Sequence, residues 1–65
     1  MSQYYRYLLF VDIENEHVFV GGADTFHDTY NLIWEENINL RKNYGVECLH
    51  WIVFRGIEKV IDFYM

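Results

Sequence analysis

Hydrophobic and polar residues repeat with a helical period over the longest patterned stretch of the chain, from Asp24 to Tyr44. At about 3.6 residues per turn, one narrow stripe of this stretch is aromatic or aliphatic apart from a single amide, and the opposite side is polar. The stripe consists of Phe26, Tyr30, Ile33, Asn37, Leu40 and Tyr44, with Trp34 on its flank. The pattern predicts one amphipathic helix whose apolar side anchors the core.

Both ends of this helix carry capping signals. Asp24 or Thr25 suits the N-cap, and Asp28 follows Thr25 at the spacing of a weaker capping box. Gly45 favours a left-handed stop after the last turn. A buried Asn37 would need a hydrogen-bond partner, and we expect it to bond a strand-end backbone group. In the alternative, this end of the helix lifts away from the sheet.

The segment Tyr4–Ile13 is rich in aromatic and branched residues and is predicted to be a strand. Its odd positions, from Tyr5 onwards, are apolar and are expected to face the helix. Leu8 and Phe10 lie on the other side and are also apolar, which favours a central position in the sheet.

Three further segments have strand character. A turn at residues 14–16 is expected to lead into a short strand, His17–Val20, which Gly21-Gly22 ends. Val46–Phe54 is predicted to be a strand with apolar residues on both faces. Ile57–Tyr64 fits either a helix or a strand, and we favour a strand because of its β-branched and aromatic composition.

These elements predict an α+β fold: a single two-layer ββαββ (or ββαβα) domain over residues 1–65, with one long amphipathic helix on one face of a mainly antiparallel sheet. Such a domain leaves the other face of its sheet uncovered. Leu8, Phe10 and Phe19 are therefore the predicted oligomer interface, because an exposed apolar patch commonly marks a contact surface.

Composition agrees with a small globular domain. A chain of 65 residues has a thin core, and aromatic residues make up 20% of this one, which compensates by burying large areas. Cys48 is the only cysteine, so an intrachain disulfide is excluded and a reducing compartment is favoured. We find no signal peptide and no run long enough to cross a membrane, and we expect a complete, cytoplasmic reading frame beginning at Met1.

Ten acidic and five basic residues give a net charge of −5, and the imbalance is concentrated in residues 1–40. That part contains seven acidic residues and only Arg6 as a basic one, whereas three acidic and four basic residues follow it. Direct binding to nucleic acid or to an anionic membrane is disfavoured, since both require a basic footprint. A basic protein partner is favoured; alternatively, the charge only keeps the domain soluble.

Residues with catalytic or metal-binding potential are few. His17, His27, His50 and Cys48 match no zinc spacing, and we expect Cys48 to be a buried mid-strand thiol. A thiol–imidazole pair of Cys48 with His50 or His17 is the alternative. Gly21-Gly22 lacks the residues of a phosphate loop at the required spacing. We therefore expect no metal, no cofactor and no enzymatic activity.

The placement of acidic residues is the remaining pattern. Three of them alternate around the first hairpin, and others follow the polar side of the helix, where successive turns place side chains about 5–6 Å apart. Carboxylates spaced in this way imitate nucleic-acid phosphates, although a solvated helix face has the same pattern. The predicted partner-binding residues are Asp12, Glu14, Glu16, Asp24, Asp28, Asn31, Glu35 and Glu36.

In its small size, acidic surface and aromatic content, the chain resembles the small proteins that bacteriophages encode to inhibit host enzymes, including CRISPR effectors. The resemblance implies an inhibitor in the host cytoplasm that occupies the basic, nucleic-acid-binding surface of a defence protein. The alternative is a homo-oligomeric structural or assembly protein, such as a homodimer, that associates through the apolar sheet face.

Overall fold

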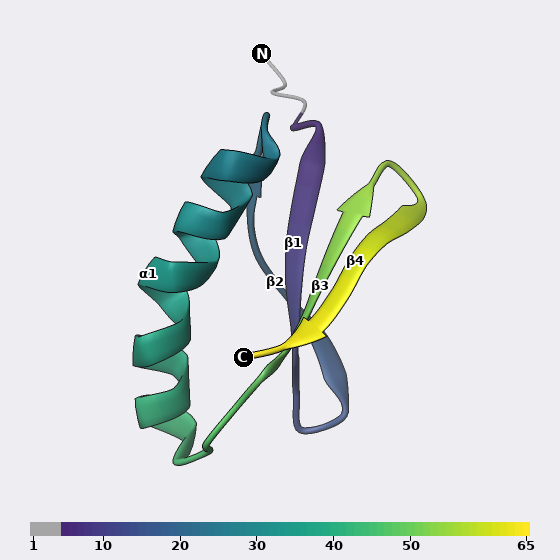
Figure 1. The fold of residues 1–65 in the computed structure, drawn as a ribbon. Helices are drawn as coiled ribbons and strands as arrows, with labels where there is room; N and C mark the ends of the chain where they lie inside the picture. Colours follow the sequence, from purple (N-terminus) through teal and green to yellow (C-terminus); the bar gives the residue numbers. More distant parts are fainter. Residues whose placement is uncertain (1–4) are drawn as a thin grey trace.

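The computed structural model describes residues 5–65 (Figure 1). The elements follow the order β1 (Tyr7–Ile13), β2 (Glu16–Ala23), α1 (Phe26–Tyr44), β3 (His50–Arg55) and β4 (Glu58–Tyr64). All strand pairs are antiparallel, in the spatial order β2-β1-β3-β4, and α1 lies along one side of the sheet. The ββαββ fold is thereby confirmed, and the ambiguous last segment is a strand. The predicted start of the first strand at Tyr4 lies outside the described residues.

The β1–β2 turn is one residue shorter than the sequence predicts, because β2 begins at Glu16. Glu14 and Asn15 both have positive φ angles, 52° and 69°. Two consecutive left-handed residues form the type of turn whose twist matches that of an antiparallel hairpin. Asn15 adopts this conformation readily, so the turn fixes the register in which Ile13 lies opposite Glu16.

Gly21 and Gly22 do not end β2, which continues to Ala23; the predicted break is wrong. Their role is steric. A Cβ atom on Gly21 would lie 3.0 Å from Leu32 Cδ2, and one on Gly22 would lie 2.4 Å from Tyr5 Cγ. The two glycines therefore let the helix and the Tyr5 ring approach the backbone of β2.

Helix α1 has the predicted caps. Thr25 is the N-cap, and its Oγ1 accepts a hydrogen bond of 3.1 Å from the backbone N–H of Asp28. At the other end, Gly45 has a φ of 65° and its N–H donates to the carbonyl of Arg41. The helix therefore begins at Phe26, directly after the predicted N-cap, and ends at Tyr44 as expected.

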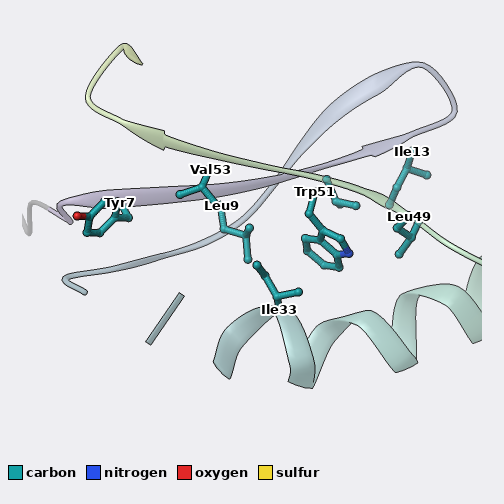
Figure 2. Close-up of a cluster of buried hydrophobic side chains, with 8 residues drawn as sticks. Tyr7, Leu9, Ile13, Ile33, Leu49, Trp51 and Val53 are labelled. Atoms are coloured by element: carbon teal, nitrogen blue, oxygen red, sulfur yellow. The ribbon is translucent and has the colours of Figure 1, made fainter. Parts of the chain in front are cut away.

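The core lies between the sheet and α1, as Figure 2 shows. Side chains alternate along β1, so its odd positions point to the helix as predicted, and β3 contributes two more. The buried cluster consists of Tyr7, Leu9, Val11, Ile13, Ile33, Leu49, Trp51 and Val53. Full burial of an aliphatic side chain contributes about 1.5–3 kcal/mol, so these few residues account for much of the stability of a chain this size.

The buried side of α1 is rotated from the predicted stripe. Thr29, Ile33 and Asn37 are the buried helix residues, whereas Phe26 and Tyr30 are exposed at its margin. Thr29 can be buried because its hydroxyl donates a 2.9 Å hydrogen bond to the carbonyl of Thr25. The two large rings instead cover the edges of the core, where they contact Tyr7 and Phe63.

Asn37 has a different partner from the one expected. Its Oδ1 accepts a 3.0 Å hydrogen bond from Nε1 of Trp51, a side chain with no exposed surface. The expectation of a strand-end backbone partner is therefore wrong, and so is the alternative in which this end of the helix lifts away. One buried hydrogen bond joins the two layers of the domain.

Candidate functional site

The predicted partner-binding residues lie in separate parts of the surface. The helix acids begin beside the N-terminal end of β1, whereas the hairpin acids lie at its other end (Figure 1). Because the molecule is 36 Å long, these two groups form no common site. Each group is therefore described by its own surroundings.

One group of four predicted residues does come together. Asp24, Asp28, Asn31 and Glu35 line an open hollow of about 330 Å³ between α1 and the end of β2. The floor and rim are completed by Tyr5, Gly22, Ala23 and Leu32. We call this surface the acidic hollow. Within residues 5–65, none of its three carboxylates forms an ion pair, so their negative charge faces solvent.

The other four predicted residues lie elsewhere. Glu36 lines a separate hollow with Val18, Val20 and Leu40. Glu14 and Glu16 lie in and after the β1–β2 turn. Asp12 lies on the face of the sheet opposite α1, where it is hydrogen-bonded. These residues add to the acidic potential but do not extend the acidic hollow.

The face of the sheet opposite α1, here called the uncovered face, carries the three residues predicted as an oligomer interface. Phe10 of β1 packs edge-on against Phe19 of β2 at a ring-centroid distance of 5.5 Å and against Phe54 of β3 at 5.6 Å. Leu8, Phe10 and Phe54 line a shallow apolar hollow of about 340 Å³ with Ile57, which is fully exposed in the β3–β4 turn. No helix or strand of the described chain covers this cluster.

A row of polar side chains crosses the same face beside the aromatic cluster. Asp12 bonds His17 through one carboxylate oxygen, and its other oxygen lies 2.6 Å from Nδ1 of His50. Nε2 of His50 bonds Asp62, whose second oxygen accepts a 2.9 Å hydrogen bond from Nζ of Lys59. We call this row, His17–Asp12–His50–Asp62–Lys59, the ladder.

The geometry of the ladder favours a charged imidazole at its centre. An ionised carboxylate only accepts hydrogen bonds, so His50 must donate from both ring nitrogens, as only the imidazolium does. The hydrogen bond to Asp62 raises the pKa of His50; partial burial opposes the rise, and Asp12 adds to it. The hydrogen bond with His50 lowers the pKa of Asp62, with a further contribution from Lys59.

Cys48 differs from its prediction. It is exposed and precedes β3, because the strand begins at His50, so it is neither mid-strand nor buried. Cys48 and His50 line the same hollow. Since both nitrogens of His50 already bond carboxylates, the ring has no free acceptor with which to activate the thiol. The described residues also contain no group of three or more histidine, cysteine or acidic side chains arranged to hold a metal ion.

Sequence reasoning missed the ladder. The sequence groups Asp12 with the hairpin acids, and His17 and His50 with the potential metal ligands. The signal that unites them is register: Asp12 pairs with His17 on one side and with His50 on the other. The strand order β2-β1-β3-β4 is needed before this signal can be recognised.

Among residues 5–65, no helix has both the length and the apolar character that crossing a membrane requires. Compared with protein-family models, with curated proteins and with solved structures, the chain gave no match. Function must therefore be argued from the two surfaces themselves.

Proposed function

We propose that the protein is a non-catalytic binding module that inhibits or regulates a basic protein partner, one that handles nucleic acid. The observation that carries this proposal is the acidic hollow. Asp24, Asp28 and Glu35 converge on one concave surface and lack a cation among the described residues. A lysine- or arginine-rich surface would supply that charge.

The lining of the acidic hollow suits a protein more than a metal ion. Carboxylates from Asp28 and Glu35 lie two helical turns apart, about 10 Å along the axis, which is too far to coordinate one cation. The Tyr5 ring and the Asn31 amide lie beside them. Aromatic and amide groups next to carboxylates offer stacking and hydrogen bonds to arginine guanidinium groups.

The mechanism follows from electrostatics. Carboxylates in the basic groove of a nucleic-acid-binding protein would occupy the positions of phosphates and exclude the nucleic acid. The domain's negative charge would speed the encounter at low ionic strength, and salt would weaken it.

Affinity capture with two matched variants tests this function. Asp28→Asn with Glu35→Lys changes the charge of the acidic hollow by three units; Glu47→Lys with Glu58→Gln makes the same change at exposed positions outside it. Wild-type protein and both variants are immobilised and exposed to a bacterial lysate at low and high salt. Double-stranded DNA is then added as a competitor, and the proteins that it releases and those that stay bound are identified by mass spectrometry.

The proposal predicts capture of a basic, nucleic-acid-handling protein that DNA or high salt releases. The acidic-hollow variant should capture less than about a tenth of this protein, and the control variant should capture most of it. A ten-fold loss corresponds to about 1.4 kcal/mol of binding free energy. Equal capture by both variants, or capture that DNA cannot compete, would contradict the proposal.

A further inference from the structure

The uncovered face combines exposed apolar side chains with paired charges. In its aromatic cluster 55% of Phe19 is accessible to solvent, and the neighbouring Ile57 is fully exposed. With His17 counted as neutral, the charges of the face cancel, because Asp12 and Asp62 are balanced by Lys59 and by the imidazolium of His50. An exposed apolar patch of this kind marks a surface that is covered in the functional state.

We propose that the uncovered face docks a second copy of this chain, in a symmetric dimer whose formation requires the positive charge of His50. This surface is separate from the acidic hollow, since the two share no residue. Failure of dimerisation would therefore leave the proposed binding of a basic partner standing, and the reverse also holds.

The outline of the molecule leaves room for an interface of standard size. The molecule measures 36 × 22 × 21 Å, so the rectangle that encloses a face along its long axis measures roughly 800 Å². An interface of standard size buries about 800 Å² on each partner. The Phe10, Phe19 and Phe54 rings lie on that face, and aromatic residues are the side chains enriched at interface centres.

Charge identifies the occupant as another copy. A basic partner would be drawn to the acidic hollow, where carboxylates are unpaired within the described chain, and not to a face whose charges already cancel. The net charge of −5 counts every histidine as neutral, so a copy with a protonated His50 carries −5 + 1 = −4. Two such copies repel each other, and they approach most favourably through a face that is neutral.

The order of charges also suits a two-fold axis. With His17, the last member of the ladder, counted as neutral, the signs from Lys59 through Asp62 and His50 to Asp12 run positive, negative, positive, negative. A row of four alternating charges meets opposite signs when its own copy runs in the reverse direction. A two-fold axis that lies in the interface perpendicular to the row produces this reversal and brings the same patch of both subunits together.

The proton on His50 controls the net charge of the uncovered face. The titratable or charged groups around it are Asp12, Glu14, His17, Lys59, Asp62 and Tyr64, with Tyr44 and Cys48 further round the same hollow. Loss of the proton leaves Asp12 and Asp62 balanced only by Lys59, so each face acquires a net negative charge. Two such faces repel, and association weakens as pH rises through the titration of His50.

Sedimentation equilibrium at about pH 6 tests the interface. Wild-type protein should form a dimer at micromolar concentration. The Phe19→Asp variant should still be monomeric at concentrations at least ten-fold above those at which the wild type dimerises. Trp34→Asp is the matched control, because Trp34 is 60% exposed but lies on α1. It introduces the same charge away from the face and should dimerise as the wild type does.

Circular dichroism confirms that each variant is folded, which exposed positions should tolerate. A wild type that stays monomeric at millimolar concentration would overturn the proposal. So would a dimer that Trp34→Asp disrupts and Phe19→Asp does not.

The pH dependence is measured in the same way at about pH 6 and pH 9. The dissociation constant of the wild-type dimer should rise by at least about three-fold, and His27→Gln, on the exposed side of α1, should retain this rise. His50→Gln should dimerise weakly at both values. A wild-type dimer of equal strength at both pH values, or a His50→Gln dimer as strong as the wild type, would overturn the requirement for the His50 charge.

Discussion

Leu8 and Leu9 are neighbours in β1, yet they belong to opposite faces of the sheet. Leu9, 1% exposed, packs under α1, whereas Leu8 lies on the uncovered face beside Phe54. On the covered face, apolar side chains pack against α1, and a buried hydrogen bond joins Asn37 to Trp51. The uncovered face instead holds a hydrogen-bonded ladder and an exposed aromatic cluster. The comparison separates residues that hold the fold together from residues that are free to bind.

The two exposed surfaces differ in a similar way. The acidic hollow carries three carboxylates without an ion pair in the described chain, while the ladder on the uncovered face pairs each of its carboxylates with a basic group. An unpaired cluster attracts an oppositely charged partner, and a neutral apolar face accepts a similar face. Under the two proposals, one small domain offers surfaces for two chemically different partners.

The largest effect on stability should come from truncating Leu9, with Leu8 as its control on the other face. Leu9→Ala should lower the free energy of unfolding by about 2–5 kcal/mol, because it leaves a cavity under the helix. Leu8→Ala removes the same atoms from a half-buried position and should cost less than about 1.5 kcal/mol. Urea denaturation measures both. Equal losses would show that the two faces do not differ in packing.

Breaking the hydrogen bond between the layers should have the next largest effect. Asn37→Leu leaves the indole N–H of Trp51 buried without a partner and should cost about 1–3 kcal/mol. Trp51→Phe in the Asn37→Leu background removes that unpaired N–H. A double-mutant cycle by urea denaturation should therefore show coupling; additive losses would mean that the hydrogen bond contributes nothing.

The ladder should make stability depend on pH. The folded pKa of His50 lies above its ordinary 6.5, so its contribution is complete below that value and is lost as pH rises through the folded pKa. The folded pKa of Asp62 lies below its ordinary 3.8, so its contribution is present above that value and is lost as pH falls through the folded pKa.

The two contributions are therefore both complete between about pH 4 and 6.5. The melting temperature of the wild type, followed by circular dichroism at fixed low concentration, should fall by a few degrees from about pH 6 to pH 9. His50→Gln should reduce this fall. An unchanged fall in the variant would assign the pH dependence to groups other than His50.

The smallest effect on stability is expected at the acidic hollow. Glu35→Lys changes an exposed side chain without an ion pair in the described chain, so the free energy of unfolding should change by less than about 0.5 kcal/mol. Binding of a nona-arginine peptide, followed by calorimetry at low salt, should nevertheless weaken several-fold. A stable variant that binds the peptide as tightly as the wild type would remove Glu35 from the proposed surface.

Local patterns in the sequence predict the elements well and their partners less well. The period of Asp24–Tyr44, the Thr25 and Gly45 caps and the alternation of β1 each depend on neighbours in the chain, and the structure has all three. The predicted end of β2 is wrong because Gly21 and Gly22 let Leu32 and Tyr5 approach the strand backbone, and these contacts are distant in the sequence or outside the strand pattern. The predicted buried face of the helix differs from the observed one because the hydroxyl of Thr29 is hydrogen-bonded within the helix, which allows Thr29 to be buried.

The candidate surfaces divide in the same way. The acidic side of the helix follows from its period, so Asp28, Asn31 and Glu35 could be grouped from the sequence. The ladder depends on which strands are neighbours, and the strand order is not contained in the period of any one strand. Asp12 and His50 are 38 residues apart in the chain, and only the pairing of β1 with β3 brings them together.

Amide NMR spectra of the ¹⁵N-labelled protein at about pH 6 test the separation of the two surfaces most directly. Spectra are recorded over a dilution series and then, at the lowest concentration, during titration with nona-arginine. Dilution should shift resonances of uncovered-face residues such as Phe10, Phe19 and Phe54, whereas the peptide should shift those of residues 24–35. If both series shift the same residues, or if dilution shifts none on the uncovered face, the domain does not have two separate binding surfaces.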